Sequence, residues 1–316
     1  MNLDLLDRRL LFVTGKGGVG KTTVAAALGL LGAGLGKRTL VCEVDAKGNL
    51  AEAFEGGALT FKARELHPGL WAMAMSTEAS LREYLRLQLK VPLLARIGPL
   101  ARTLDFVATA APGVKEILTV GKLAYEVRER NYDLVVVDAA ATGHVVAQLA
   151  APRAIAELVK VGRIQQQTAW MGDILADAST TGAVLVASPE EMPVSETLDL
   201  RERIRDETDV DVAAVVVNRV LPELFGRSEQ EVFERLQAPD AVARLEGEVG
   251  GEVRTVLDAA ELAVRLRRTG AAHLARLREG LPPRLPVLYV PELFTRSHGA
   301  RATRQVAEAL GEELDT

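Results

Sequence analysis

The sequence predicts an α/β fold with a mostly parallel β-sheet flanked by helices on both faces. Short apolar runs recur along the 316 residues, with helix-like apolar spacing between them. Continuous apolar runs are typical of parallel strands, which are buried on both faces of the sheet. Strands are expected in the runs that begin at Leu10, Arg38, Tyr132, Gly182, Val212 and Pro286. A further run, LWAMAMS at Leu70, fits either a short strand or a buried helical turn.

Some of the connecting stretches are too long for simple crossovers and are rich in Leu, Ala, Arg and Glu. We expect helical subdomain insertions at approximately 51–130, 150–180 and 221–283. No Gly/Ser/Pro-rich linker separates them, so residues 1–316 are interpreted as one domain. Within the first insertion, 81–107 is strongly apolar but broken by Pro92 and Pro99. It predicts two helices packed on the core or on a second subunit, with an exposed client-binding groove as the alternative.

Composition excludes several classes of protein. A net charge of -5 with 4% aromatic residues disfavours nucleic-acid binding. No run of about eighteen apolar residues is present, and the N-terminal residues are acidic where a signal peptide would be basic, so we expect a cytoplasmic protein. Cys42 is the only cysteine, which rules out a disulfide or a cysteine-based metal site within one chain. Any metal is expected to be a hard, oxygen-preferring ion.

The stretch TGKGGVGKTT, residues 14–23, fits two phosphate-binding patterns at once. Gly15, Gly17 and Gly20 match the dinucleotide pattern G-x-G-x-x-G, for which Glu43 or Asp45 would supply the ribose-binding acid. The same loop also matches the P-loop pattern G-x-x-x-x-G-K-[ST]. In both cases it follows a predicted strand and begins a predicted helix, where backbone N–H groups and the helix N-terminus bind phosphate.

The pair Lys21–Thr22 favours a nucleoside triphosphate over a dinucleotide. A triphosphate needs a lysine on its β- and γ-oxygens and a hydroxyl on Mg²⁺, whereas a dinucleotide pyrophosphate is bound mostly by backbone. The sequence therefore predicts a P-loop NTPase that uses ATP and Mg²⁺. The predicted nucleotide-binding residues of the loop are Gly15, Lys16, Gly17, Gly18, Val19, Gly20, Lys21, Thr22 and Thr23.

Two acidic residues at strand ends complete the predicted chemistry. Asp138 ends the run YDLVVVD, as expected of the carboxylate that orients Mg²⁺ with Thr22. Asp45 follows the second strand and is the favoured residue for positioning the attacking water near the γ-phosphate, and it is also a candidate metal ligand. Each residue could instead be a simple turn or capping residue.

Three further polar residues have weaker assignments. Asn49 is a candidate nucleotide contact, although NLAE with Glu52 also fits a capping box for the next helix. Asn218 ends VAAVVVN, where a side-chain amide could read the adenine edge. His144 lies just beyond Asp138 and is a candidate sensor of the γ-phosphate, with a structural hydrogen-bonding role as the alternative.

Five segments resemble one family in its own order along the chain. GKGGVGKTT resembles the deviant P-loop of the arsenical pump-driving and tail-anchored-protein-targeting ATPases, relatives of the partitioning ATPases and the nitrogenase iron protein. EVDAKGNLAEAF and DAAATGHVVAQL resemble the two switch segments of the family, and APGVKE resembles its P-G-x-x-E element. VVVNRVLPE and VPELF resemble its adenine-binding segments.

The resemblance implies a dimer whose subunits face each other across two nucleotides. Lys16 would reach into the partner's site and help neutralise the phosphates, while Lys21 and Thr22 would serve the chain's own nucleotide. Asp45 would activate water, and Asp138 would lie at Mg²⁺. Asn218, Pro291 and Leu293 would surround adenine. The implied function is a dimeric switch ATPase whose nucleotide state controls binding of an unknown protein client, with membrane contact at most peripheral and through that client.

The sequence also departs from the family pattern. Ala46 and Gly48 replace a Pro and a His in the first switch, and Ala139 and Ala141 replace a Thr and a Pro in the second. These changes leave slow hydrolysis, a nucleotide-gated scaffold, and a heterodimer with a paralogue as alternatives to a homodimeric ATPase. The motor subunit of an arsenite or anion pump is disfavoured, because the multi-thiol site cannot be built from Cys42 alone.

Overall fold

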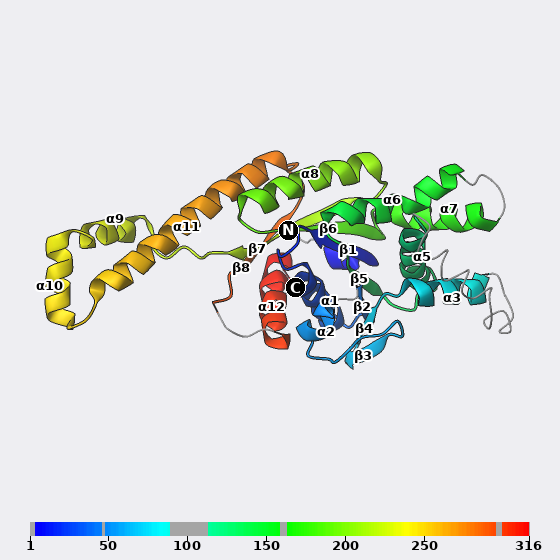
Figure 1. Ribbon diagram of the computed structural model, residues 1–316, viewed down its shortest axis with the longest axis horizontal. Coiled ribbons are helices and arrows are strands. Elements are labelled where there is room, and N and C mark those ends of the chain that lie inside the picture. The colour runs from blue at the N-terminus through cyan, green and yellow to red at the C-terminus, as the bar shows by residue number, and fades with distance from the viewer. Residues whose placement is uncertain (1–3, 46–47, 89–112, 159–162, 295–298, 316) are drawn as a thin grey trace.

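The structure is a computed structural model that describes residues 4–45, 48–88, 113–158, 163–294 and 299–315. Within these residues, eight strands form one sheet in the order β3-β4-β2-β5-β1-β6-β7-β8. Every neighbouring pair is parallel except β3 and β4. The expected α/β fold with a mostly parallel sheet is confirmed (Figure 1).

All six apolar runs form strands, and the ambiguous run at Leu70 forms a seventh. An additional strand, β3, was not predicted, because its sequence RELH is charged and mostly exposed at the edge of the sheet. The strands are β1 (Leu10–Gly15), β2 (Thr39–Glu43), β3 (Arg64–His67), β4 (Leu70–Ala74), β5 (Leu134–Asp138), β6 (Thr181–Ala187), β7 (Val212–Val220) and β8 (Val287–Pro291).

Helices cover both faces of the sheet. A short 3-10 helix, Asp4–Asp7, precedes β1. The α-helices are α1 (Lys21–Gly34), α2 (Asn49–Ala53), α3 (Thr77–Gln88), α5 (Val114–Arg128), α6 (Thr142–Leu158), α7 (Arg163–Ala176), α8 (Glu191–Glu207), α9 (Arg227–Leu236), α10 (Pro239–Val249), α11 (Val253–Gly280) and α12 (Ala300–Leu314). None of these described helices is both long and apolar enough to cross a bilayer.

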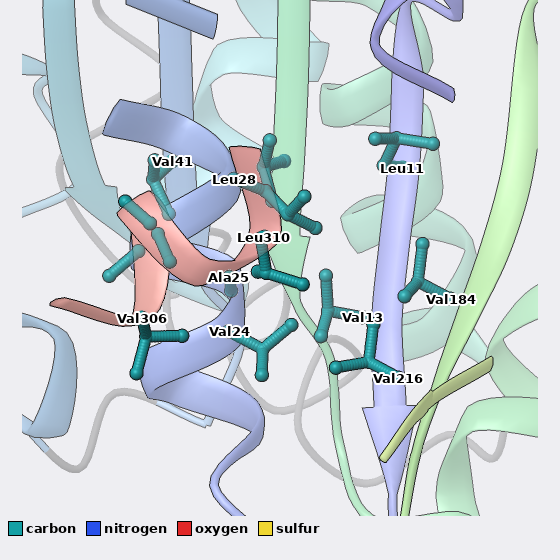
Figure 2. Close-up of a cluster of buried hydrophobic side chains, with 14 of the residues drawn as sticks. Leu11, Val13, Val24, Ala25, Leu28, Val41, Val184, Val216, Val306 and Leu310 are labelled. Carbon is teal, nitrogen blue, oxygen red and sulfur yellow. The ribbon is translucent and has the colours of Figure 1, made fainter. Parts of the chain in front are cut away.

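Alternation along each strand divides the core into two apolar clusters. Leu11 and Val13 of β1 belong to the cluster under α1 and α12, whereas Leu10 and Phe12 belong to the cluster under α5, α6 and α8. Successive side chains of a strand point to opposite faces, so a buried central strand supplies both clusters. Figure 2 shows the first cluster, where Leu28 of α1 lies with Leu310 of α12. The last helix of the chain is thus packed against the first.

The ranges expected to hold helical insertions contain helices among their described residues, and the first range also contains two strands. The range 51–130 also contains β3 and β4, so the helical part begins only at α3, after two strands of the main sheet. The range 150–180 holds the end of α6 and α7. The range 221–283 holds α9, α10 and α11, which extend away from the sheet in Figure 1. Most of the predicted helix pair at 81–107 lies outside the described residues.

Candidate functional site

The glycine-rich loop connects the end of β1 to the start of α1, at the carboxyl edge of the sheet. Gly15 approaches the neighbouring strand β6 so closely that a Cβ there would lie 2.2 Å from the carbonyl oxygen of Val186. Gly18 and Gly20 have φ of 88° and 94°, in the left-handed region that favours glycine. These backbone constraints bend the loop back over the N-terminus of α1, whose first N–H groups have no partner within the helix.

Asn218, at the carboxyl end of β7, braces this loop from behind. Its side-chain amide donates a hydrogen bond to the backbone carbonyl of Val19, 2.9 Å away. A Cβ on Gly20 would lie 2.3 Å from the same nitrogen, so glycine is needed here for space as well as for φ. Asn218 is only 7% exposed, and its side-chain oxygen accepts from the backbone N–H of Arg219. A role for Asn218 at adenine remains a prediction.

Thr22 and Asp138 meet at the centre of the site. The hydroxyl of Thr22, in the first turn of α1, donates to the Oδ2 of Asp138 at 2.6 Å. Burial raises the pKa of Asp138 to about 6, although the Thr22 hydrogen bond and the charge of Lys21 act in the opposite direction. Lys21 points its ammonium back over the loop and donates to the carbonyl of Lys16 at 3.1 Å. The predicted hydroxyl, carboxylate and lysine therefore converge.

Glu43, the last residue of β2, holds the start of α2. Its two carboxylate oxygens accept from the backbone N–H groups of Gly48 and Asn49, at 3.3 and 3.0 Å. The capping box that was the alternative role for Asn49 and Glu52 is not formed: Gly48 is the N-cap residue and makes no side-chain cap bond. A buried carboxylate from the sheet does the capping instead, because Glu43 is 3% exposed and lies directly below the helix start. The same contact excludes Glu43 as a free ribose-binding acid.

A hollow of about 460 Å³ lies over the loop at this edge of the sheet. Nine predicted site residues line it: Gly17, Gly18, Gly20, Lys21, Thr22, Thr23, Asp45, Asn49 and Asp138. Its other walls include Gly299, Ala302 and Thr303 at the start of α12, which sequence reasoning missed. Thr303 is buried and donates to the carbonyl of Ala53 at the end of α2, which ties α12 to the site.

Several predicted site residues lie outside this lining. Gly15 and Val19 support the loop from beneath, and Val19 is buried. Pro291 ends β8 and is exposed, while Leu293 packs against the core cluster under α1. Their assignment to adenine remains a prediction. His144 is exposed and lines a second hollow of about 350 Å³, which shares Asp45 with the first.

The residues present fit a magnesium–nucleotide complex. No atom lies within 4 Å of a Cβ built on Gly17 or Gly18, so a phosphate can approach the backbone there. The hydroxyl of Thr22 and the carboxylate of Asp138 are hard oxygen donors of the kind that Mg²⁺ prefers. Lys21 supplies the positive charge for terminal phosphates.

Lys16 makes a contact that the sequence did not predict. Its ammonium lies 2.5 Å from Oε1 of Glu196, in the second turn of α8. The other carboxylate oxygen of Glu196 accepts from the hydroxyl of Thr142, the first residue of α6, at 3.3 Å. Lys16 does not line the hollow that Lys21 lines, and the ammonium groups of the two lysines donate to different acceptors in this chain.

A parallel sheet, a glycine-rich loop leading into a helix, and a Lys–Thr–Asp centre together define a P-loop nucleotide-binding protein. Comparison with known proteins gives the family. The chain matches the family model described as "Anion-transporting ATPase" over residues 8–172 and 158–242, and it belongs to that family. It is an ATPase of the class that its motifs resemble.

Curated relatives agree with this assignment. The chain is 31% identical over 255 residues to "ATPase BagA" of Mycobacterium tuberculosis, covering 77% of this chain and 71% of that protein. It is 34% identical over 146 residues to "ATPase get3" of Schizosaccharomyces japonicus, covering 45% and 43%. "ATPase GET3" of Chaetomium globosum is 30% identical over 169 residues, covering 52% and 49%.

Proposed function

We propose that this ATPase is a magnesium-dependent dimeric switch, whose nucleotide state controls binding of a protein client. The observation that carries the proposal is the 2.6 Å contact between Thr22 and Asp138 beside Lys21, at the wall of one hollow. In P-loop enzymes this hydroxyl and carboxylate hold Mg²⁺ between them. Thr22 and Asp138 would hold Mg²⁺, which would supply positive charge that stabilises the phosphates during the reaction.

The predicted site residues then have separate roles. Backbone N–H groups of the loop bind the phosphates, and Lys21 neutralises their charge. Asp45 lines the same hollow and would position the attacking water. Lys16, which does not line the hollow of its own chain, would enter the site of a second subunit. The second subunit is either another copy or a paralogue.

The candidate client surface is a helical region away from the phosphate loop. An apolar cavity of about 320 Å³ lies between α3, α5, α6 and α7. Tyr84, Leu118, Trp170 and Met171 are among its lining residues. Because α6 begins at Thr142, four residues after Asp138, a change at the magnesium site has a short covalent path to this helical region. That connection supports a helical surface that responds to nucleotide.

A metalloid pump receives no support from the thiol chemistry. Cys42, the only cysteine in the sequence, is buried in β2, and burial raises its pKa to about 12. Such a thiol offers no thiolate at neutral pH and no second thiol joins it. A site that needs several thiol ligands, such as one for arsenite, therefore cannot form within one chain.

Two variants test the proposal. Lys21→Ala should abolish ATP turnover and reduce ATP affinity by at least about tenfold, a loss on the order of 1.4 kcal/mol. Unchanged ATP turnover by Lys21→Ala would contradict the proposed magnesium–ATP site. Asp45→Asn in single-turnover experiments then separates water positioning from a structural role, because a catalytic residue should slow the chemical step at saturating ATP. Sedimentation with Mg²⁺ and a non-hydrolysable ATP analogue measures dimer formation directly.

A further inference from the structure

The strongest unassigned feature is the three-residue contact that joins Lys16, Glu196 and Thr142. It links three separate elements: the glycine-rich loop, the start of α8 and the start of α6. Glu196 reaches the loop because β6, the strand before α8, lies directly beside β1 in the sheet. Both side chains of the ion pair are about one-third exposed, at 28% for Lys16 and 31% for Glu196. Solvent can reach the pair, so it can open without unfolding the protein.

Glu196 competes with any phosphate for the ammonium of Lys16. An ammonium group carries one charge, and a carboxylate at 2.5 Å already offsets it. A partly exposed pair of this kind contributes little stability, so a triphosphate with several charges can displace it. Until it is displaced, the ion pair keeps the ammonium of Lys16 away from the phosphates of its own subunit. Without Glu196, the loop would hold Lys16 as a second cation beside those phosphates, in addition to Lys21.

Thr142 connects this competition to the chain's own magnesium site. Its hydroxyl shares the carboxylate of Glu196 with Lys16, and Asp138 lies four residues earlier. If the segment between Asp138 and α6 shifts on nucleotide binding, Glu196 loses a hydrogen-bond donor. The carboxylate of Glu196 therefore contacts both Lys16, which would leave, and Thr142, whose segment would move.

We propose that Glu196 is a positioning residue that holds Lys16 within its own subunit and releases it as the dimer forms. The inference rests on the proposed function of Lys16 in the partner's site. Glu196 acts only through Lys16 and touches no nucleotide. Its removal lowers the free-energy cost of association, because no ion pair has to be opened when Lys16 crosses.

Association of the full-length protein with Mg²⁺ and a non-hydrolysable ATP analogue tests this, measured by sedimentation across a range of protein concentrations. Glu196→Gln should lower the concentration for half-maximal dimer about three- to tenfold, since each dimer opens two such pairs. The half-maximal protein concentration for ATP turnover should fall in parallel, while the plateau rate changes less. Glu196→Asp, which withdraws the carboxylate by one methylene, should fall between wild type and Glu196→Gln.

Asp199→Asn is the matched control. Asp199 lies one turn further along α8 and is exposed, so its loss changes net charge equally without touching Lys16. This variant should associate like wild type. The double variant Lys16→Ala/Glu196→Gln should behave like Lys16→Ala alone, because Glu196 has nothing to hold once the lysine is gone.

The outcomes separate the two proposals. If Lys16→Ala associates as well as wild type, the role of Lys16 in the partner's site is wrong, whatever Glu196 does. If Lys16→Ala prevents association but Glu196→Gln leaves it unchanged or weakens it, the inference about Glu196 is wrong and the proposed function stands. An equal gain in Asp199→Asn would likewise overturn it, because the effect would then be one of net charge.

Discussion

The side-chain amide of Asn218 donates to the backbone carbonyl of Val19, 2.9 Å away, across 199 residues of sequence. This single hydrogen bond ties the end of β7 to the loop that receives the phosphates. The contact is buried, so neither group has water as an alternative partner. The shape of the phosphate loop therefore depends on a residue that the sequence associates with the nucleotide base.

Asn218→Ala should destabilise the nucleotide-free protein by about 1–3 kcal/mol, because it leaves the carbonyl of Val19 buried without a partner. It should also weaken binding of inorganic tripolyphosphate and ATP alike. Thermal unfolding and calorimetric titration measure these effects. A variant that loses ATP affinity but keeps normal stability and tripolyphosphate affinity would show that Asn218 reads adenine and does not brace the loop.

Asp138→Asn should stabilise the protein in the absence of Mg²⁺ and nucleotide, and more so at higher pH. The pKa of Asp138 is raised from 3.8 to about 6, so the folded protein binds its proton more tightly than the unfolded chain. Its contribution to stability is present below about pH 4 and is lost as pH rises through 6. At pH 8 the variant should gain up to about 3 kcal/mol, and at pH 5 about half of that.

The matched control for this pH effect is Asp133→Asn. Arg38 holds the pKa of Asp133 at about 2, well below its ordinary value, so this carboxylate is ionised throughout the range from pH 5 to 8. Its replacement should change the melting temperature by the same amount at both pH values. Equal differences for Asp138→Asn at pH 5 and pH 8 would contradict the assignment of a raised pKa.

Glu43→Ala should reduce stability by about 1–3 kcal/mol, because the N–H groups of Gly48 and Asn49 lose a charged acceptor. It should also slow ATP turnover, since Asp45 lies between Glu43 and α2. Glu52→Ala is the control, because Glu52 would be the important residue if the capping box existed. Thermal melts of both variants decide the matter: a larger loss in Glu52→Ala would contradict the observed cap.

Much of the fold could be predicted because its strands carry a strong local signal. Runs such as LVVVD and TGAVLVA are apolar throughout, as buried parallel strands are. The edge strand β3 gives no such signal, since RELH is exposed and charged. As an edge strand, β3 pairs only with β4. A local sequence pattern contains no information about that pairing.

The site divides in the same way. Recognisable sequence motifs predict that Lys21, Thr22 and Asp138 lie together at one phosphate site, and all three line the same hollow in the structure. The alternative capping box at α2 is not formed, although Asn49 and Glu52 satisfy the local sequence rule, because Glu43 of β2 caps the helix instead. Glu196 and Thr303 lie far from the loop in sequence and belong to ordinary helical stretches. Only the packing of α8 and α12 places them beside it.

The position of α12 also affects how the protein is made. The phosphate loop is synthesised well before Gly299, Ala302 and Thr303, which form one wall of its hollow. The same helix buries Leu310 against α1. At a translation rate of about 5–20 residues per second, roughly 15–60 seconds separate the loop from its missing wall. During that interval a nascent chain carries the nucleotide motif on an open, partly uncovered core, so ATP meets a complete site only after α12 has been synthesised.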